Sequence, residues 1–441
     1  MLTIKIPNNF QPERQYIIDV IFGHFFAVDY TVQTAGCSVS EINTARGTLV
    51  LNDSFFAAAA GAYIKREYLP EVKYYRGNFI PEPDLPVLYG EPEIIVRDKY
   101  IDCRIDIFAA VFFMLARWEE CLPAPKDIYG RFPATKSVAW QNDFLRRPVV
   151  AEWLELLWNL LQRIAPELRR KENKFQLYMT HDVDKLEKWP ETSLPKELLR
   201  AVLGRAEQNA WSVLLSFWQA KKDITKDPFY TFPLLKDSLL KYNQVKAVFY
   251  FIAGGHTQYE RFYDIQSEKI KNLLLFLENE RVEFGLHPSY VTFDNAALLS
   301  DELACLEQVI GKKIRESRQH YLRFAAPATW RHLAQCGIEI DSSGMYADKE
   351  GFRFGTGAVF PVFDVEQRKI LPLLERPLLY MDQRDYECGG YQGTAQNGAE
   401  IFEIIRYCRK YKTDCTVLFH NNVLESAEYK KTYFEVLKCA E

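Results

Sequence analysis

An apolar run ends in two acids in the stretch Phe175-Gln176-Leu177-Tyr178-Met179-Thr180-His181-Asp182-Val183-Asp184. A buried strand that ends in carboxylates delivers them to one edge of a sheet, where α/β proteins usually build their active sites. Carboxylates at such an edge would bind a metal or transfer protons. The competing interpretation is that Asp182 and Asp184 only cap the next helix or make an Asx turn. Repetition of the pattern along the chain favours the functional interpretation.

Four more short apolar runs end in side chains that could bind a metal or carry a proton. They are 282–286 before His287, 318–324 around His320, 338–340 before Asp341, and 416–419 before His420. Amphipathic stretches of helical period lie between the runs, at 268–280, 301–310, 329–336 and 399–411. With further strand candidates at 245–252 and 375–380, about seven strand-helix units follow residue 174. Such alternation indicates parallel strands joined by crossover helices, and seven units are close to a closed barrel.

From residue 175 onward the chain resembles the NodB-type polysaccharide deacetylases, a family of metal-dependent carbohydrate esterases whose fold is an irregular (β/α) barrel. The resemblance rests on four motifs in the family's order: Thr180-His181-Asp182-Val183-Asp184, Glu283-Phe284-Gly285-Leu286-His287, Arg318, and Val417-Leu418-Phe419-His420. It implies that Asp182 is the catalytic base and that Asp184 and His287 bind the metal. It further implies that Arg318 orients the base and that His420 is the general acid.

One expected metal ligand is absent from the second motif. The family places another His four residues after the first, and Val291 stands there in this chain. A catalytic zinc site normally has three protein ligands and an open position, so the best substitute is His320, beside Arg318 at another strand end. The competing interpretation makes His320 a substrate-contacting group or one that orients a ligand. His181 is a weaker candidate, because it points away from the two acids on an extended strand.

Other polar residues lie where deacetylase-like proteins place substrate-contacting loops. Asp341 begins Asp341-Ser342-Ser343-Gly344, Arg353 lies in the glycine-rich segment 351–357, and Tyr290 follows His287. We predict substrate contacts for these three residues, and the alternative is a glycine turn with a capping Asp. Asp382 follows a strand and could face the same pocket, although one Asp at a strand end is more often a turn residue.

Three functions are compatible with these residues. The first is a metal-dependent deacetylase that acts on an N-acetylated sugar. Hydrolysis of the N-acetyl group needs an activated water, and a divalent cation, zinc above all, lowers the pKa of water from about 15.7 towards 7. The resemblance extends to a divergent branch that carries an extra N-terminal domain and is associated with bacterial surface-polysaccharide synthesis. The second is a catalytically silent protein that binds saccharide or a biosynthetic partner. The third is a metal-dependent amidohydrolase on a small non-sugar amide.

The length of 441 residues predicts two domains. Residues 1–172 form a smaller α/β domain with helices at 14–26, 106–120 and 149–164 and strands at 30–33 and 47–51. Residues 173–441 form the irregular (β/α) barrel of about seven strands, with a helical insertion near 186–240 that includes 194–220. The pairs Arg117 with Glu119 and Glu120, and Asp127 with Arg131, could be a polar site, but salt bridges against the second domain are favoured.

Composition excludes several classes of protein. With 55 basic and 59 acidic residues the net charge is −4, so nothing indicates a general nucleic-acid binder. Nine cysteines without Cys-x-x-Cys pairs fit reduced thiols. The N-terminus lacks the apolar core of a signal peptide, and no apolar run is long enough to span a membrane. We therefore expect a cytoplasmic enzyme whose oligomeric state the sequence leaves open.

Overall fold

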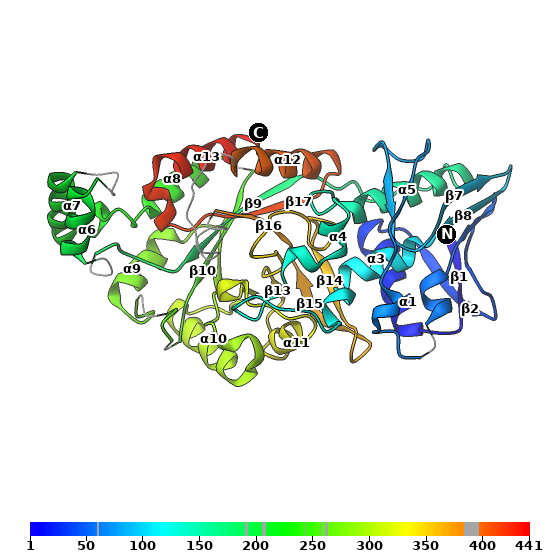
Figure 1. Ribbon diagram of the computed structural model, residues 1–441, viewed down its shortest axis with the longest axis horizontal. Helices are drawn as coiled ribbons and strands as arrows, with labels where there is room; N and C mark the ends of the chain where they lie inside the picture. The colour runs from blue at the N-terminus through cyan, green and yellow to red at the C-terminus, as the bar shows by residue number, and fades with distance from the viewer. Residues whose placement is uncertain are drawn as a thin grey trace.

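The computed structural model describes residues 1–59, 61–189, 193–204, 209–242, 244–255, 257–260, 263–382 and 397–441. Its main sheets have six and nine strands, and a separate ribbon has two. Figure 1 shows an elongated molecule with the N-terminal sheet at one end and the helices α6 (Leu194–Val202) and α7 (Ala210–Lys222) at the other. Among the described residues, every helix is too short or too polar to cross a membrane.

The N-terminal sheet is mixed. Its strands are β1 (Leu2–Pro7), β2 (Tyr30–Ala35), β3 (Ser40–Asn43), β4 (Thr48–Leu51), β7 (Gly90–Val96) and β8 (Tyr100–Ile105). They lie in the order β2-β1-β3-β4-β8-β7, with parallel pairing of β1 to β2 and of β4 to β8. The two-stranded ribbon consists of β5 (Lys73–Tyr75) and β6 (Leu85–Val87). Both strands predicted in this region are present.

Helices complete the N-terminal unit. They are α1 (Gln11–Ile18), which continues as a π-helix over Asp19–Phe25, α2 (Ser54–Ala58), α3 (Ile107–Leu115), α4 (Val138–Gln141) and α5 (Val149–Ile164). Every residue of α3 is apolar and buried, so this helix lies at the centre of the core. The helix predicted at 149–164 is confirmed to the residue. The one predicted at 106–120 ends earlier, because the backbone at Arg117 is left-handed, with a φ of 50°, and a 3-10 turn follows.

The larger sheet is a curled half-barrel. Its strands are β9 (Gln176–Val183), β10 (Lys246–Phe251), β11 (Val282–Leu286), β12 (Glu316–Ser317), β13 (Ile340–Asp341), β14 (Phe360–Asp364), β15 (Lys369–Glu375), β16 (Leu378–Met381) and β17 (Asp414–Leu418). The order is β14-β15-β13-β12-β11-β10-β9-β17-β16, and all neighbours are parallel except β14 and β15. The count differs from the seven strands predicted because β14 and β15 form a hairpin, which a search for strand-helix units does not detect.

Helices cover the larger sheet. They are α8 (Phe232–Lys241), α9 (Glu268–Leu277), α10 (Ala296–Ile310), α11 (Ala328–Gln335), α12 (Asn397–Lys410) and α13 (Ala427–Lys438). Four of them, α9 to α12, confirm the helices predicted from apolar periodicity, within a few residues at each end. The predicted helical insertion near 186–240, which includes 194–220, contains α6 and α7.

The N-terminal unit and the larger sheet pack directly against each other through α1 and the β14–β15 hairpin. The β14–β15 hairpin reaches α1, where the hydroxyl of Tyr16 donates to the carbonyl of Pro361 at 2.9 Å and its ring lies 4.9 Å from that of Phe363. Glu13 on the same helix forms an ion pair with Arg368 in the turn of the hairpin at 2.7 Å. The hydrophobic core is continuous across this contact. The predicted boundary at residue 172 stays a prediction.

Candidate metal centre

Three side chains from separate strand ends meet at the carboxyl edge of the larger sheet. Asp184 follows β9, His287 follows β11, and His320 lies in a short 3-10 turn after β12. One ligand atom from each lies within 4.8 Å of the other two. The Nε2 atoms of His287 and His320 are 3.4 and 3.8 Å from Oδ1 of Asp184. Parallel strands produce this convergence, because their carboxyl ends share one edge.

Both histidines are oriented through their second ring nitrogen. Nδ1 of His287 lies 2.5 Å from the carbonyl oxygen of Arg318, which can only accept, so Nδ1 carries the proton. Nδ1 of His320 lies 3.4 Å from a carboxylate oxygen of Glu260, which fixes the same tautomer. In each ring the lone pair of Nε2 is therefore directed at the cluster. A carboxylate or carbonyl partner on the far nitrogen is typical of histidines that bind metals.

The donor set fits a divalent cation. Oδ1 of Asp184 is buried and has no hydrogen-bond partner among the described residues, although buried oxygens are normally satisfied. Two imidazole nitrogens and this oxygen make the three-ligand set that hydrolytic metal sites use. Val291 supplies no ligand and is 37% exposed, so the third donor comes from His320 on a different strand end.

The charges of the cluster favour an ionised carboxylate. Burial opposes ionisation of Asp184, but the adjacent His320, His287 and His420 hold the pKa of its carboxyl well below the ordinary value. Burial also disfavours protonation of His287, yet the charges of Asp182 and Asp184 raise its pKa. A bound cation would occupy the position of that proton, since imidazole binds metals only when it is neutral.

The predicted base and its predicted partner lie in contact. Arg318 is fully buried, and its guanidinium donates to Oδ1 of Asp182 at 2.9 Å and to Oγ1 of Thr180 at 2.8 Å. It also donates to the backbone carbonyl and the hydroxyl of Ser342, both at 3.0 Å. The other oxygen of Asp182 lies 3.6 Å from Nε2 of His287. Asp182 is thus held on one side by a fixed cation and faces the metal cluster on the other.

His420 has a carboxylate partner that holds its orientation. Asp382, after β16, accepts from Nδ1 of His420 and from its backbone N–H, both at 2.7 Å. Nε2 then lies 3.6 Å from Oδ2 of Asp184. Burial disfavours the imidazolium, but Asp382 and the cluster acids raise the pKa of His420 to about 9. The ring therefore carries a proton at neutral pH, as a general acid requires.

The remaining predicted residues lie in different surroundings. His181 is buried, with Nδ1 2.8 Å from the carbonyl of Phe419, and burial lowers its pKa to about 4. The hydroxyl of Ser343 donates to Asp341 at 2.6 Å, and burial raises the pKa of that acid to about 6. Arg353 is buried against Glu120 at 2.9 Å. None of these three residues belongs to the group of candidate metal ligands, and the substrate contacts predicted for Asp341 and Arg353 stay predictions.

Tyr290 and a loop of the N-terminal unit flank the cluster instead. The backbone N–H of Tyr290 donates to Glu260 at 2.6 Å, beside the bond from that acid to His320. Its ring lies 6.4 Å from that of Tyr129, which belongs to the turn-rich segment 126–133. Arg323 donates to the carbonyls of Tyr129 at 3.0 Å and Tyr290 at 2.9 Å and so joins the two segments.

The two predicted salt-bridge groups connect the N-terminal unit to the half-barrel unit. Arg117 is bonded to Glu119 and Glu120 at 2.8 Å each, and its guanidinium also donates to the hydroxyl of Tyr346 at 2.7 Å. Arg131 pairs with Asp127 at 2.7 Å and donates to the carbonyl of Tyr321 at 2.6 Å. Both groups have the structural role that the sequence favoured.

Glu260 is the residue that sequence reasoning missed. It lies in a loop between β10 and α9, and no strand, spacing or paired acid marks it. Asp382 had a signal, its position directly after a strand, but that position alone does not distinguish a partner of His420 from a turn residue. Both acids act on a histidine that is distant in sequence, at 60 and 38 residues.

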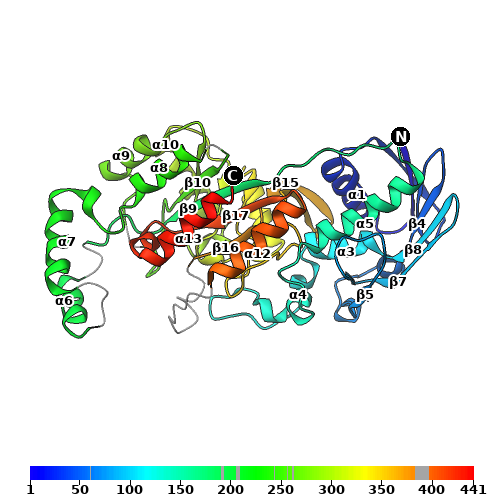
Figure 2. The same cartoon turned by 90° about the horizontal axis from the view of Figure 1, so that it is seen from above.

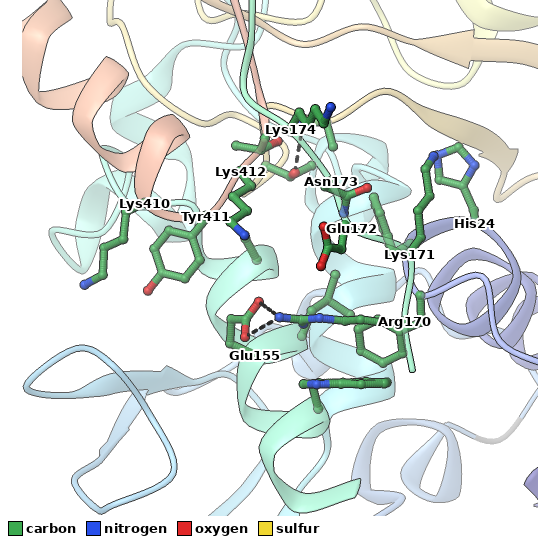
Figure 3. A pocket seen from close by; sticks show the side chains of 18 of the residues that line it. His24, Glu155, Arg170, Lys171, Glu172, Asn173, Lys174, Lys410, Tyr411 and Lys412 are labelled. Atoms are coloured by element: carbon green, nitrogen blue, oxygen red, sulfur yellow. Dashed lines mark hydrogen bonds and ion pairs between the residues drawn. The ribbon is translucent and has the colours of Figure 1, made fainter. Parts of the chain in front are cut away.

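A large cavity lies away from these residues. It has a volume of about 1070 Å³ and opens between α5, the segment 169–174 and the loop 410–414. Figure 3 shows Arg170 paired with Glu155 on one wall and Lys412 on another. This cavity adjoins the start of β9 and β17. The three candidate metal ligands lie at the other end of the strands, roughly 26 Å away along the eight residues of β9 at 3.3 Å per residue. Volume alone therefore does not mark the site.

Comparisons with known proteins relate parts of this chain to one sequence family and to several solved structures. Residues 2–166 match a family described only as a family of unknown function (DUF7033). No curated protein matches the chain in sequence. One similar solved structure is a candidate polysaccharide deacetylase from Mycobacterium smegmatis, with 13% identity, a TM-score of 0.39, and coverage of 60% of this chain and 85% of that one.

Two further solved structures are similar to a comparable share of the chain. PuuE allantoinase has 10% identity and a TM-score of 0.38, with coverage of 61% of this chain and 84% of that one. A mutant CE4-family pseudoenzyme with restored enzymatic activity has 10% identity and a TM-score of 0.29, with coverage of 61% and 64%. Because all three TM-scores are low, we base the functional assignment on the residues of the site.

Proposed function

We propose that this chain is a metal-dependent deacetylase that hydrolyses the N-acetyl group of a saccharide, such as a surface-polysaccharide precursor. The observation that carries the proposal is the convergence of three metal donors with two separate proton carriers at one sheet edge. Asp184, His287 and His320 are the donors. Asp182 and His420 are the proton carriers, and each lies within 3.6 Å of a donor residue.

Asp184, His287 and His320 would hold the cation, and we propose zinc, because two imidazoles and a carboxylate suit that ion. When bound, it would lower the pKa of a water molecule and polarise the amide carbonyl. The histidines need no rearrangement to bind it, since Glu260 and the carbonyl of Arg318 already direct their Nε2 atoms inward. This preorganisation supports catalysis over a purely structural role.

The two proton carriers have complementary positions. Asp182 would take the proton of the attacking water, and the guanidinium of Arg318 holds that carboxylate toward the cluster. His420 would give its Nε2 proton to the leaving amine, because Asp382 fixes the opposite ring nitrogen. Amide hydrolysis needs a base for the attacking water and an acid for the leaving amine, and each of the two carriers lies beside a different donor residue. Loss of either should reduce the rate by about 10²–10⁴.

A silent binding protein is the second candidate. The observation that favours it is Val291, which replaces one expected donor in the second motif with an apolar, 37% exposed side chain. Under this proposal the cluster binds a cation weakly and the protein recognises saccharide without turnover. The two proposals differ in metal stoichiometry and in acetate release.

The test combines elemental analysis with acetate release. Purified protein loaded with zinc, cobalt, manganese or nickel is assayed on N-acetylhexosamines, their nucleotide-linked forms and their oligomers. The His420→Ala variant should retain its metal and lose activity by about 10²-fold or more. His332→Ala on α11 is the matched control and should behave like the wild type. Saccharide binding without acetate release, and with equal affinity in both His420 forms, would replace catalysis with the binding proposal.

A further inference from the structure

Helices α6 and α7 form a hairpin that stands away from the rest of the molecule. Figures 1 and 2 show it at the end opposite the N-terminal sheet, beyond α8 and α9. Six large apolar side chains of the hairpin are exposed: Leu199, Val202, Leu203, Trp211, Leu215 and Trp218. Trp211 is 82% exposed and Trp218 is 60% exposed, whereas Trp118, Trp153 and Trp330 are fully buried.

The exposed side chains form one stripe on each helix. On α6 and its C-cap they recur at intervals of three and one residues, and on α7 at intervals of four and three. These intervals place each set on a single face of its helix. Exposed apolar side chains grouped on one face of a helix mark an interaction site, since scattered single residues would need no explanation.

The hairpin is also positively charged. Its described residues, 193–204 and 209–222, contain four basic residues and one acid, so 4 − 1 = +3, in a chain whose net charge is −4. The acid, Glu197, is bonded to Arg200 at 2.8 Å. Lys196, Lys221 and Lys222 are exposed and have no acidic partner among the described residues.

We propose that the α6–α7 hairpin docks on an anionic lipid surface, with its axis in the plane of that surface. Exposed tryptophans next to lysines are typical of segments that bind at a membrane interface. Indole rings insert at the headgroup level, and lysines are attracted to anionic lipids. The helices have 9 and 13 residues. At 1.5 Å per residue they are roughly 14 and 20 Å long, which suits interfacial binding.

Charge decides between a lipid surface and a second copy of this chain. A symmetric dimer through the hairpin would bring the same +3 segment of both copies together. An anionic surface would instead neutralise that charge. This proposal is independent of the metal centre, because no hairpin residue contributes to the site.

Sedimentation with lipid vesicles tests the proposal on the full chain. We expect binding to vesicles of phosphatidylcholine mixed with phosphatidylglycerol, weak or no binding to phosphatidylcholine alone, and loss of binding at high salt. Replacing Trp211 and Trp218 with Ser should weaken binding by about tenfold or more. Each Lys→Gln change at Lys196 or Lys221 should weaken it by about fivefold.

Matched controls come from other exposed positions. Leu275→Ser on α9, where the leucine is 70% exposed, and Lys431→Gln on α13, where the lysine side chain is 76% exposed, should bind like the wild type. Quenching of tryptophan fluorescence by brominated lipid should be present in the wild type and reduced in the double Trp variant. Equal binding to both vesicle types by wild type and double variant would overturn the proposal. Self-association that needs the tryptophans, without vesicle binding, would overturn it in favour of a dimer contact.

Discussion

Replacing Arg318 with Met would break the most connected buried ion pair of the site. The guanidinium donates four hydrogen bonds of 2.8 to 3.0 Å, one of them to Asp182 and the others to Thr180 and Ser342. Met fills much of the same volume but donates nothing. The carboxylate of Asp182, 2% exposed, would then remain buried without its cation.

We expect Arg318→Met to lower the free energy of unfolding by about 3–5 kcal/mol. Removing one partner of a buried ion pair costs about 3–5 kcal/mol, because the remaining charge stays desolvated. Replacing Asp182 with Asn in the same chain removes that lone charge. The double variant should therefore be more stable than Arg318→Met alone by about 1–3 kcal/mol, the size of coupling found between neighbouring groups.

Amide hydrogen exchange in β9 and β10 of metal-free protein measures this loss of stability. A loss of about 3–5 kcal/mol corresponds to exchange on the order of 10²- to 10⁴-fold faster in the Arg318→Met variant, at about 1.4 kcal/mol for each factor of ten. Arg406→Met on α12 is the control, since that side chain is 72% exposed. Acceleration below about tenfold, or a double variant that exchanges as fast as the single one, would refute the reasoning.

Three further outcomes follow from other contacts. Glu260→Gln should weaken metal binding by about 10–100-fold in a chelator competition, because it loosens the ring of His320; unchanged affinity would mean that Glu260 only supports its loop. Burial raises the pKa of Asp341 to about 6, so ionisation of this acid destabilises the folded chain as pH rises from about 4 to 6. Asp341→Asn should thus gain about 1–3 kcal/mol at pH 7 and little at pH 4 in urea unfolding; equal effects at both pH values would contradict this sign. Arg323→Gln should speed proteolytic cleavage within 126–133 several-fold, because it removes the bonds to Tyr129 and Tyr290; an unchanged cleavage pattern would show that other contacts hold the segment.

The periodic elements could be predicted because their signals are local. The helix at 149–164 and four of the six helices that cover the larger sheet, α9 to α12, follow from apolar spacing. The edge shared by Asp184, His287 and His420 also follows from sequence, since parallel strands place their carboxyl ends together. The location of the site can therefore be predicted from the order of strands and helices alone, before any side-chain contact is known.

Other features depend on contacts that leave no periodic signal. The sequence places Arg353 in a glycine-rich loop, where we predict a substrate contact. In the structure it pairs with Glu120, which lies 233 residues earlier in the chain. β14 and β15 are joined by a tight turn and not by a crossover helix, and the hairpin is held by its contact with α1. No periodic pattern in the sequence indicates that contact. The exposed stripe of α6 and α7 reads as an ordinary amphipathic core pattern, and only the fold shows that no described residue covers it.

The N-terminal unit gains a role from the way in which the third donor is held. His320 is followed by Tyr321 and Leu322, whose φ angles of 61° and 48° are left-handed. Such backbone costs about 1–2 kcal/mol for each residue with a Cβ, so neighbouring contacts must stabilise it. Arg131 supplies one of them by donating to the carbonyl of Tyr321 at 2.6 Å. Because His320 takes the place of the donor that Val291 cannot provide, the segment 126–133 helps to complete the proposed metal site, whose other two donors follow strands of the half-barrel.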